Sequence, residues 1–82
     1  MIKIEEWENL YYISIDNISE DDEDIAKYLN LPLKKYRNIM KKYGAKRFRY
    51  TDSYFDNKED IQKFINSEEL TKYLIMAKLT GD

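Results

Sequence analysis

The chain has 82 residues, a formal net charge of -2 and neither cysteine nor histidine. This length allows one small domain with a single core, and the lack of cysteine excludes a disulfide framework and a thiolate metal site. No window approaches the roughly 18 apolar residues that cross a bilayer, and the first residues lack the apolar run of a signal peptide. We therefore expect a single cytoplasmic domain, residues 1–82, without membrane contact.

The first 18 residues contain two competing patterns. Ile4 and Trp7 share a helical face with Leu10 or Tyr11, whereas Tyr11, Ile13 and Ile15 alternate as in a strand that begins beyond Asn9. We predict a short helix near residues 3–10 followed by an extended piece, together an N-terminal extension of residues 1–18. The aromatic side chains in this extension either stack on bases or, as we expect, supply core area.

Residues 19–44 read as two short helices joined by a tight corner. Ser19 is typical of an N-cap, and the acidic run 20–24 suits the first turn of a helix better than a calcium loop, whose ligand spacing and glycine it lacks. Pro32 cannot continue that helix and sets the corner. The second helix is predicted from Leu33 to about Tyr43, with Gly44 as its left-handed C-cap residue.

The second helix has two contrasting faces. The i, i+3, i+4, i+7 spacing places four apolar side chains on the inner face: Tyr36, Ile39, Met40 and Tyr43. At about 100° per residue, the outer face is then cationic. Its members are Lys34, Lys35, Arg37, Asn38, Lys41 and Lys42.

A small hairpin is predicted over residues 45–56. Phe48 and Tyr50 alternate with Arg47 and Arg49, which is strand periodicity, and residues 51–53 suit a turn before a brief return strand. One edge of this hairpin is basic.

Two C-terminal helices are predicted over residues 57–80. Asp56 or Asn57 can cap a helix over residues 58–66, whose inner face carries Ile61, Phe64 and Ile65. A last helix over residues 67–79 is apolar on more than one side. The N-terminal segment covers that surface, as we expect, or it binds a second copy or a partner.

The charges are sorted along the chain. Residues 1–33 hold two lysines and nine acids, residues 34–50 hold eight cations and no acid, and residues 51–82 hold four lysines and seven acids. A solvated surface normally interleaves its signs, although single exposed lysines on helices are common. Seventeen consecutive residues without an acid, across a helix and a hairpin, indicate a surface for a polyanion.

The order helix, corner, helix, basic hairpin, helix over residues 19–66 resembles winged helix-turn-helix proteins of the MerR and phage excisionase type. The resemblance is carried by residues 24–32, which look like that family's first helix and turn, and by residues 53–61, which look like its second wing strand and next helix. This chain departs from the family in having Asn30-Leu31-Pro32 where a glycine is common, a wing turn without glycine, and an extension with no counterpart. The fold class implied is mainly α with a small β-hairpin: a helix-turn-helix (19–44), a wing (45–56) and C-terminal helices (57–80).

The resemblance implies double-stranded DNA binding by a small phage or mobile-element protein, as a transcriptional regulator or an excisionase-like factor. The second helix would enter the major groove with Lys34, Lys35, Arg37, Asn38 and Lys41, and the wing would contact the backbone with Lys46, Arg47 and Arg49. By their chemistry, Asn38 can read adenine and Arg37 can read guanine. Contact with roughly 4 to 6 phosphates predicts a slope of log affinity against log salt of about -4 to -5.

Other functions are weighed against this one. A protein-interaction module would use the acidic, tyrosine-rich surface or the apolar last helix to bind a host or phage protein. Because one DNA-binding module buries little surface, a homodimer through the last helix is also expected. The lack of histidine, cysteine and a glycine-rich phosphate loop argues against an enzyme, and no cofactor, metal or small-molecule ligand is predicted.

Overall fold

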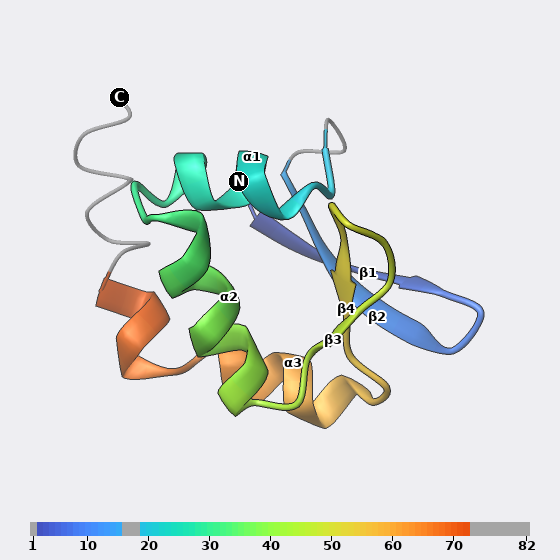
Figure 1. Cartoon of the computed structure of the whole chain (residues 1–82). Coiled ribbons are helices and arrows are strands. Elements are labelled where there is room, and N and C mark those ends of the chain that lie inside the picture. The colour runs from blue at the N-terminus through green and yellow to red at the C-terminus, as the bar shows by residue number, and fades with distance from the viewer. Residues whose placement is uncertain (1, 16–18, 73–82) are drawn as a thin grey trace.

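The computed structural model of the chain describes residues 2–15 and 19–72. Of these residues, 44% are helical and 26% lie in strands or bridges. The chain is thus an α+β fold with a hairpin, two helices, a second small hairpin and further helices in sequence order (Figure 1). The prediction of a mainly α fold is wrong, because it treated the N-terminal residues as a helix and an extended piece.

The N-terminal residues form an antiparallel hairpin of β1 (Ile2–Trp7) and β2 (Leu10–Ile15). Its two-residue turn has positive φ at both Glu8 (48°) and Asn9 (65°), the backbone of the primed turns whose twist matches that of paired strands. The predicted helix over residues 3–10 is therefore wrong, whereas the predicted strand beyond Asn9 is confirmed as β2.

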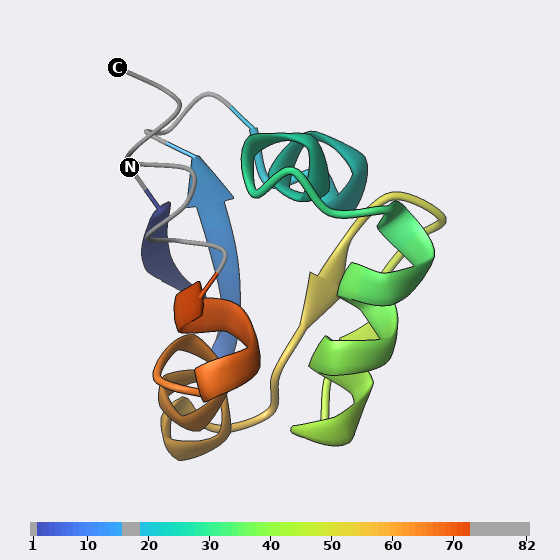
Figure 2. The same ribbon diagram turned by 90° about the vertical axis from the view of Figure 1, so that its left-hand side faces the viewer.

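The two hairpins are joined by backbone hydrogen bonds. Tyr11 N donates to Phe55 O at 2.9 Å, and Phe55 N donates to Tyr11 O at 2.7 Å, just beyond the end of β4 (Ser53–Tyr54). On its other side, β4 pairs with β3 (Lys46–Arg47). Figure 2 shows the consequence: β4 lies between the N-terminal hairpin and the second helix.

The second hairpin is shorter than predicted. β3 ends at Arg47, and residues 48–51 form bends rather than a strand. The backbone turns there because Phe48 N donates to Asp52 O at 2.9 Å and closes the loop early. The predicted strand alternation of Phe48 and Tyr50 is therefore wrong, and both side chains are exposed.

Helix α1 (Asp22–Tyr28) begins two residues later than a cap at Ser19 would place it. The N-cap is Asp21, whose Oδ1 accepts a hydrogen bond from Glu23 N at 2.8 Å. Ser19 Oγ instead accepts from Asp21 N at 3.1 Å, so it orders the approach to the helix. The assignment of Ser19 as the cap is wrong, but the acidic run does form a helix start, as predicted.

The corner between α1 and α2 (Leu33–Lys42) is a Schellman motif. Asn30 adopts φ of 59°, its N–H donates to Lys27 O at 3.0 Å, and Leu31 N donates to Ala26 O at 2.9 Å. Asparagine tolerates this left-handed backbone, so it takes the place of the glycine that is common in such turns. The two helices pack against each other across the corner.

The end of α2 confirms the predicted stop. Gly44 has φ of 98°, directly after the C-cap residue Tyr43. A Cβ at Gly44 would lie 3.2 Å from Asp60 Oδ2, so backbone and space both favour glycine there.

The core lies where α1, α2 and α3 (Lys58–Ile65) meet the two hairpins. The predicted inner faces are confirmed, since Tyr36, Ile39, Met40, Ile61 and Phe64 are all buried. The Phe64 ring is central: it stacks on Phe55 at 5.6 Å between centroids and lies 6.0 Å from Tyr36. Asn57 caps α3 by accepting from Asp60 N at 2.9 Å.

The chain is helical again over residues 68–72. The remainder of the predicted last helix, including the surface expected to form a homodimer, lies outside the described residues. Among the helices that the structure does describe, none is both long and apolar enough to cross a membrane.

Candidate nucleic-acid interface

The outer face of α2 is exposed because its apolar face is held in the core. Tyr36, Ile39 and Met40 are at most 3% exposed. The polar side chains on the opposite side of the helix therefore face solvent; the exposed ones are Lys34, Lys35, Asn38, Lys41 and Lys42.

Side chains from α2 and β3 border one hollow of about 330 Å³. Arg37 and Lys41 line it from the helix, and Lys46 and Arg47 line it from the strand. Asn38 lines it as well, and none of the carboxylates in the described part of the chain does. The sequence-predicted helix and wing residues are thus neighbours, and a rigid anion that reaches the hollow meets cations from both elements.

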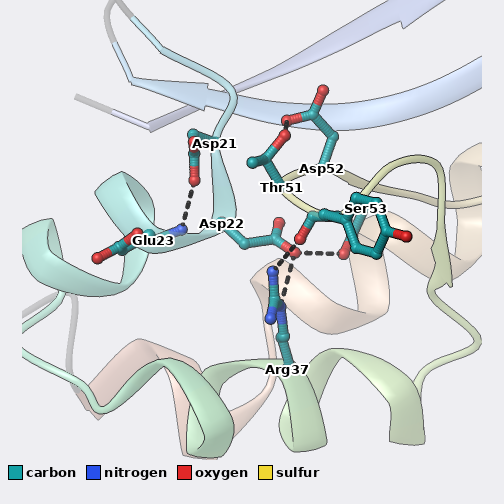
Figure 3. Close-up of polar contacts among 8 residues, drawn as sticks. Asp21, Asp22, Glu23, Arg37, Thr51, Asp52 and Ser53 are labelled. Carbon is teal, nitrogen blue, oxygen red and sulfur yellow. Dashed lines mark hydrogen bonds and ion pairs between the residues drawn. The ribbon is translucent and has the colours of Figure 1, made fainter.

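Arg37 differs from the other cations because its guanidinium is bound by groups from other elements of the protein (Figure 3). Its Nε lies 3.2 Å from Asp22 Oδ2, and its Nη2 donates to Tyr50 O at 2.7 Å. Ser53 Oγ donates to the same Asp22 oxygen at 2.6 Å. Arg37 therefore links α1, α2 and the loop before β4, and we do not retain it as a base-reading residue.

Asp22 is the residue that sequence reasoning missed. The sequence indicates only that Asp22 belongs to the first turn of a helix, yet the residue is only 2% exposed. Burial raises the pKa of its carboxyl above the usual value, and the hydrogen bonds from Ser53 and Arg37 only partly offset that cost. The sequence gives little indication of this burial, because the spacing of an acidic run does not show which of its carboxylates points into the protein.

Two further cations are paired with acids from distant parts of the chain. Lys46 Nζ forms an ion pair with Asp56, and this hydrogen bond raises the pKa of the lysine. Lys42 Nζ lies 3.1 Å from Glu69 Oε2. Both pairs are largely exposed, and such pairs contribute little to stability, so an external anion can replace the acid at small cost.

Three predicted cations form no ion pair with the residues that the structure describes: Lys34, Lys41 and Arg47. Arg49 points elsewhere, with its Cζ 5.1 Å from the centroid of the Phe48 ring. We define the basic face as Lys34, Asn38, Lys41 and Arg47. It offers three cations for phosphates and one amide that can both donate and accept.

Comparisons with protein-family models, with curated proteins and with solved structures gave no match.

Proposed function

We propose that the protein binds double-stranded DNA through the basic face. The observation that carries the proposal is the hollow between α2 and β3, which receives cations from both elements and no carboxylate from the described residues. A helix with an exposed polar side is the element that fits the major groove, and the adjacent strand can reach the flanking backbone.

The expected affinity is lower than the sequence alone indicated. Arg37 is bound by Asp22 and does not count as a phosphate contact. The contacts would come from the three cations of the basic face, and from Lys46 if this lysine exchanges Asp56 for a phosphate. Three to four phosphate contacts predict a slope of log affinity against log salt of about -3 to -4.

Base recognition rests on Asn38. Its side chain is exposed on the outer face of α2, between the cations that would fix the helix on the backbone. An asparagine amide can donate to adenine N7 and accept from adenine N6, so a preference for adenine at one position is expected.

The biological setting follows from this proposal. A helix, corner, helix and basic ribbon that bind DNA would suit a MerR- or excisionase-like protein acting on transcription or recombination in the cytoplasm. The N-terminal hairpin would then be an addition to that pattern.

The test is a fluorescence anisotropy titration of a labelled random 20-bp duplex at several salt concentrations. The variant carries Lys34→Gln, Lys41→Gln and Arg47→Gln. We expect it to lose almost all of the salt dependence, because it lacks the cations that release counterions.

The matched control removes the same charge elsewhere. Lys27→Gln, Lys58→Gln and Lys63→Gln change three exposed lysines on α1 and α3. We expect this triple variant to keep a slope near that of the wild type. A wild-type slope near zero, or an equal loss in both triple variants, would contradict the proposal.

A further inference from the structure

A second surface lies between the two hairpins. It is a groove of about 250 Å³ lined by Trp7, Leu10 and Tyr12 from the N-terminal hairpin and by Phe48 and Tyr54 from the second one. Trp7 is 54% exposed and Phe48 47%, although large aromatic side chains normally supply core area in so small a domain. The expectation that Trp7 belongs to the core is thus wrong. We call this surface the aromatic groove.

The rings of the aromatic groove are arranged edge to face. The Phe48 centroid lies 6.4 Å from Trp7 and 6.3 Å from Tyr54, with the ring planes 70° and 83° apart. Aromatic faces carry partial negative charge, and cations bind to them. The Arg49 guanidinium already lies over Phe48, so a face of this cluster accommodates a cation of that shape.

Acidic side chains complete the lining. Glu20 and Asp52 border the aromatic groove, and neither forms an ion pair with the described residues. The pKa of Tyr12 is raised by its burial and by the negative charges of Glu20 and Glu5, as expected in a negative local potential. A nucleic-acid phosphate would be repelled here, whereas a positively charged side chain would be attracted.

We infer that the aromatic groove binds a protein segment that carries an arginine or lysine side chain. The aliphatic part of such a side chain would lie on Trp7 and Leu10, and its charged end would meet the ring faces and the carboxylates of Glu20 and Asp52. Figure 2 shows α2 and the N-terminal hairpin on opposite sides of β4, so a partner protein that approaches from the hairpin side would leave the outer face of α2 open to a DNA duplex.

Trp7 is the chain's single tryptophan and gives a direct signal for binding. The full-length protein is titrated with the capped peptide Leu-Arg-Leu-Arg-Leu while tryptophan fluorescence is recorded. The comparison peptide replaces each arginine with citrulline, which keeps the shape of the side chain and removes its charge. We expect saturable binding of the arginine peptide and at least about tenfold weaker binding of the citrulline peptide.

Variants locate the site. Asp52→Asn and Glu20→Gln remove the carboxylates without changing the aromatic lining, and each is expected to weaken arginine-peptide binding severalfold. Phe48→Leu keeps an apolar side chain but removes the ring face, and it is also expected to weaken arginine-peptide binding severalfold. Glu59→Gln on α3 removes the same charge from an exposed site and should leave binding unchanged.

Several results would overturn the inference. Equal binding of the two peptides would show that the groove accepts apolar side chains without regard to charge. Absence of a saturable signal with either peptide, or equal weakening by Glu59→Gln, would remove the site. If a single-stranded thymidine oligonucleotide bound more tightly than the arginine peptide, and Phe48→Leu abolished that binding, the rings would be assigned to base stacking instead. Each variant's thermal melting curve shows whether it is folded.

Discussion

The buried carboxylate of Asp22 holds the side chain of Arg37 in place. Asp22 Oδ2 accepts a hydrogen bond from Arg37 Nε at 3.2 Å. Asp22 N also donates to Thr51 O at 2.7 Å, so the start of α1 is bound both to α2 and to the loop before β4. These contacts fix how α2 lies relative to the loop before β4, the strand with which β3 pairs. The shape of the basic face therefore depends on a residue that does not belong to it.

Replacing Asp22 should destabilise the fold by an amount that depends on what replaces it. Asp22→Ala removes the acceptor of Arg37 Nε and of Ser53 Oγ, and the guanidinium keeps only its bond to Tyr50 O, which we expect to cost about 2–4 kcal/mol. Asp22→Asn keeps an acceptor and avoids burying a charge, so we expect about half that loss. Urea denaturation measures both.

The control for Asp22 is Glu23→Gln in the same helical turn. Glu23 is exposed and pairs only loosely with Lys27 at 3.9 Å, so its replacement should change the free energy of unfolding by less than about 0.5 kcal/mol. A loss in Asp22→Ala no larger than in Glu23→Gln would mean that the buried contacts contribute nothing.

The contribution of Asp22 to the free energy of unfolding should fall as the pH rises. Burial raises the pKa of its carboxyl in the folded protein above the usual 3.8, so the folded state binds the proton more tightly than the unfolded chain does. The resulting stabilisation is complete below about pH 3.8 and is lost as the pH rises through the folded-state pKa. Asn at this position does not titrate, so the stability of the wild type minus that of Asp22→Asn should decrease from pH 3.5 to pH 7. Urea denaturation at intervals over this range measures it, and a difference that increases with pH would contradict the prediction.

The predictions from sequence succeeded where one short pattern decided the structure. The apolar spacing of Tyr36, Ile39 and Met40 determined which side of α2 is buried, and Gly44 marked its end because few other residues adopt that backbone. The inner face of α3 was found in the same way.

The predictions failed where the deciding contact was distant in sequence or used an unusual residue. The turn at Glu8 has positive φ without a glycine, so the N-terminal hairpin carried no standard turn signal. The ion pair of Lys46 spans 10 residues, and the contact of Arg37 with Asp22 spans 15. Local periodicity cannot show which cations such contacts occupy, and this explains why the candidate site is smaller in the structure than in the sequence.

Tyr36 carries a hydroxyl that the fold does not use. Its side chain is fully buried, and Tyr36 Oη has no hydrogen-bond partner among the residues that the structure describes. Burial, with a smaller effect of Asp22, raises the pKa of this phenol far above its usual value. Because an unpaired buried hydroxyl costs free energy, we expect Tyr36→Phe to stabilise the protein by about 1 kcal/mol. Thermal and urea denaturation measure the change.

Tyr43→Phe is the control for Tyr36. Tyr43 packs near the same Phe64 ring but is only half-buried, so its hydroxyl can reach water and its loss should change stability little. If Tyr36→Phe were destabilising by 1 kcal/mol or more, the hydroxyl would have a partner in solution.

The corner at Asn30 gives the last prediction, because its backbone has φ of 59°. Alanine pays about 1–2 kcal/mol to adopt this left-handed conformation, whereas glycine adopts it freely. We expect Asn30→Ala to destabilise the protein by about 1 kcal/mol and Asn30→Gly to leave its stability within about 0.5 kcal/mol of the wild type. The side chain of Asn30 is exposed, so the two variants differ mainly in backbone freedom. Equal losses in both, measured by urea denaturation, would show that the amide side chain and not the left-handed backbone is what the corner requires.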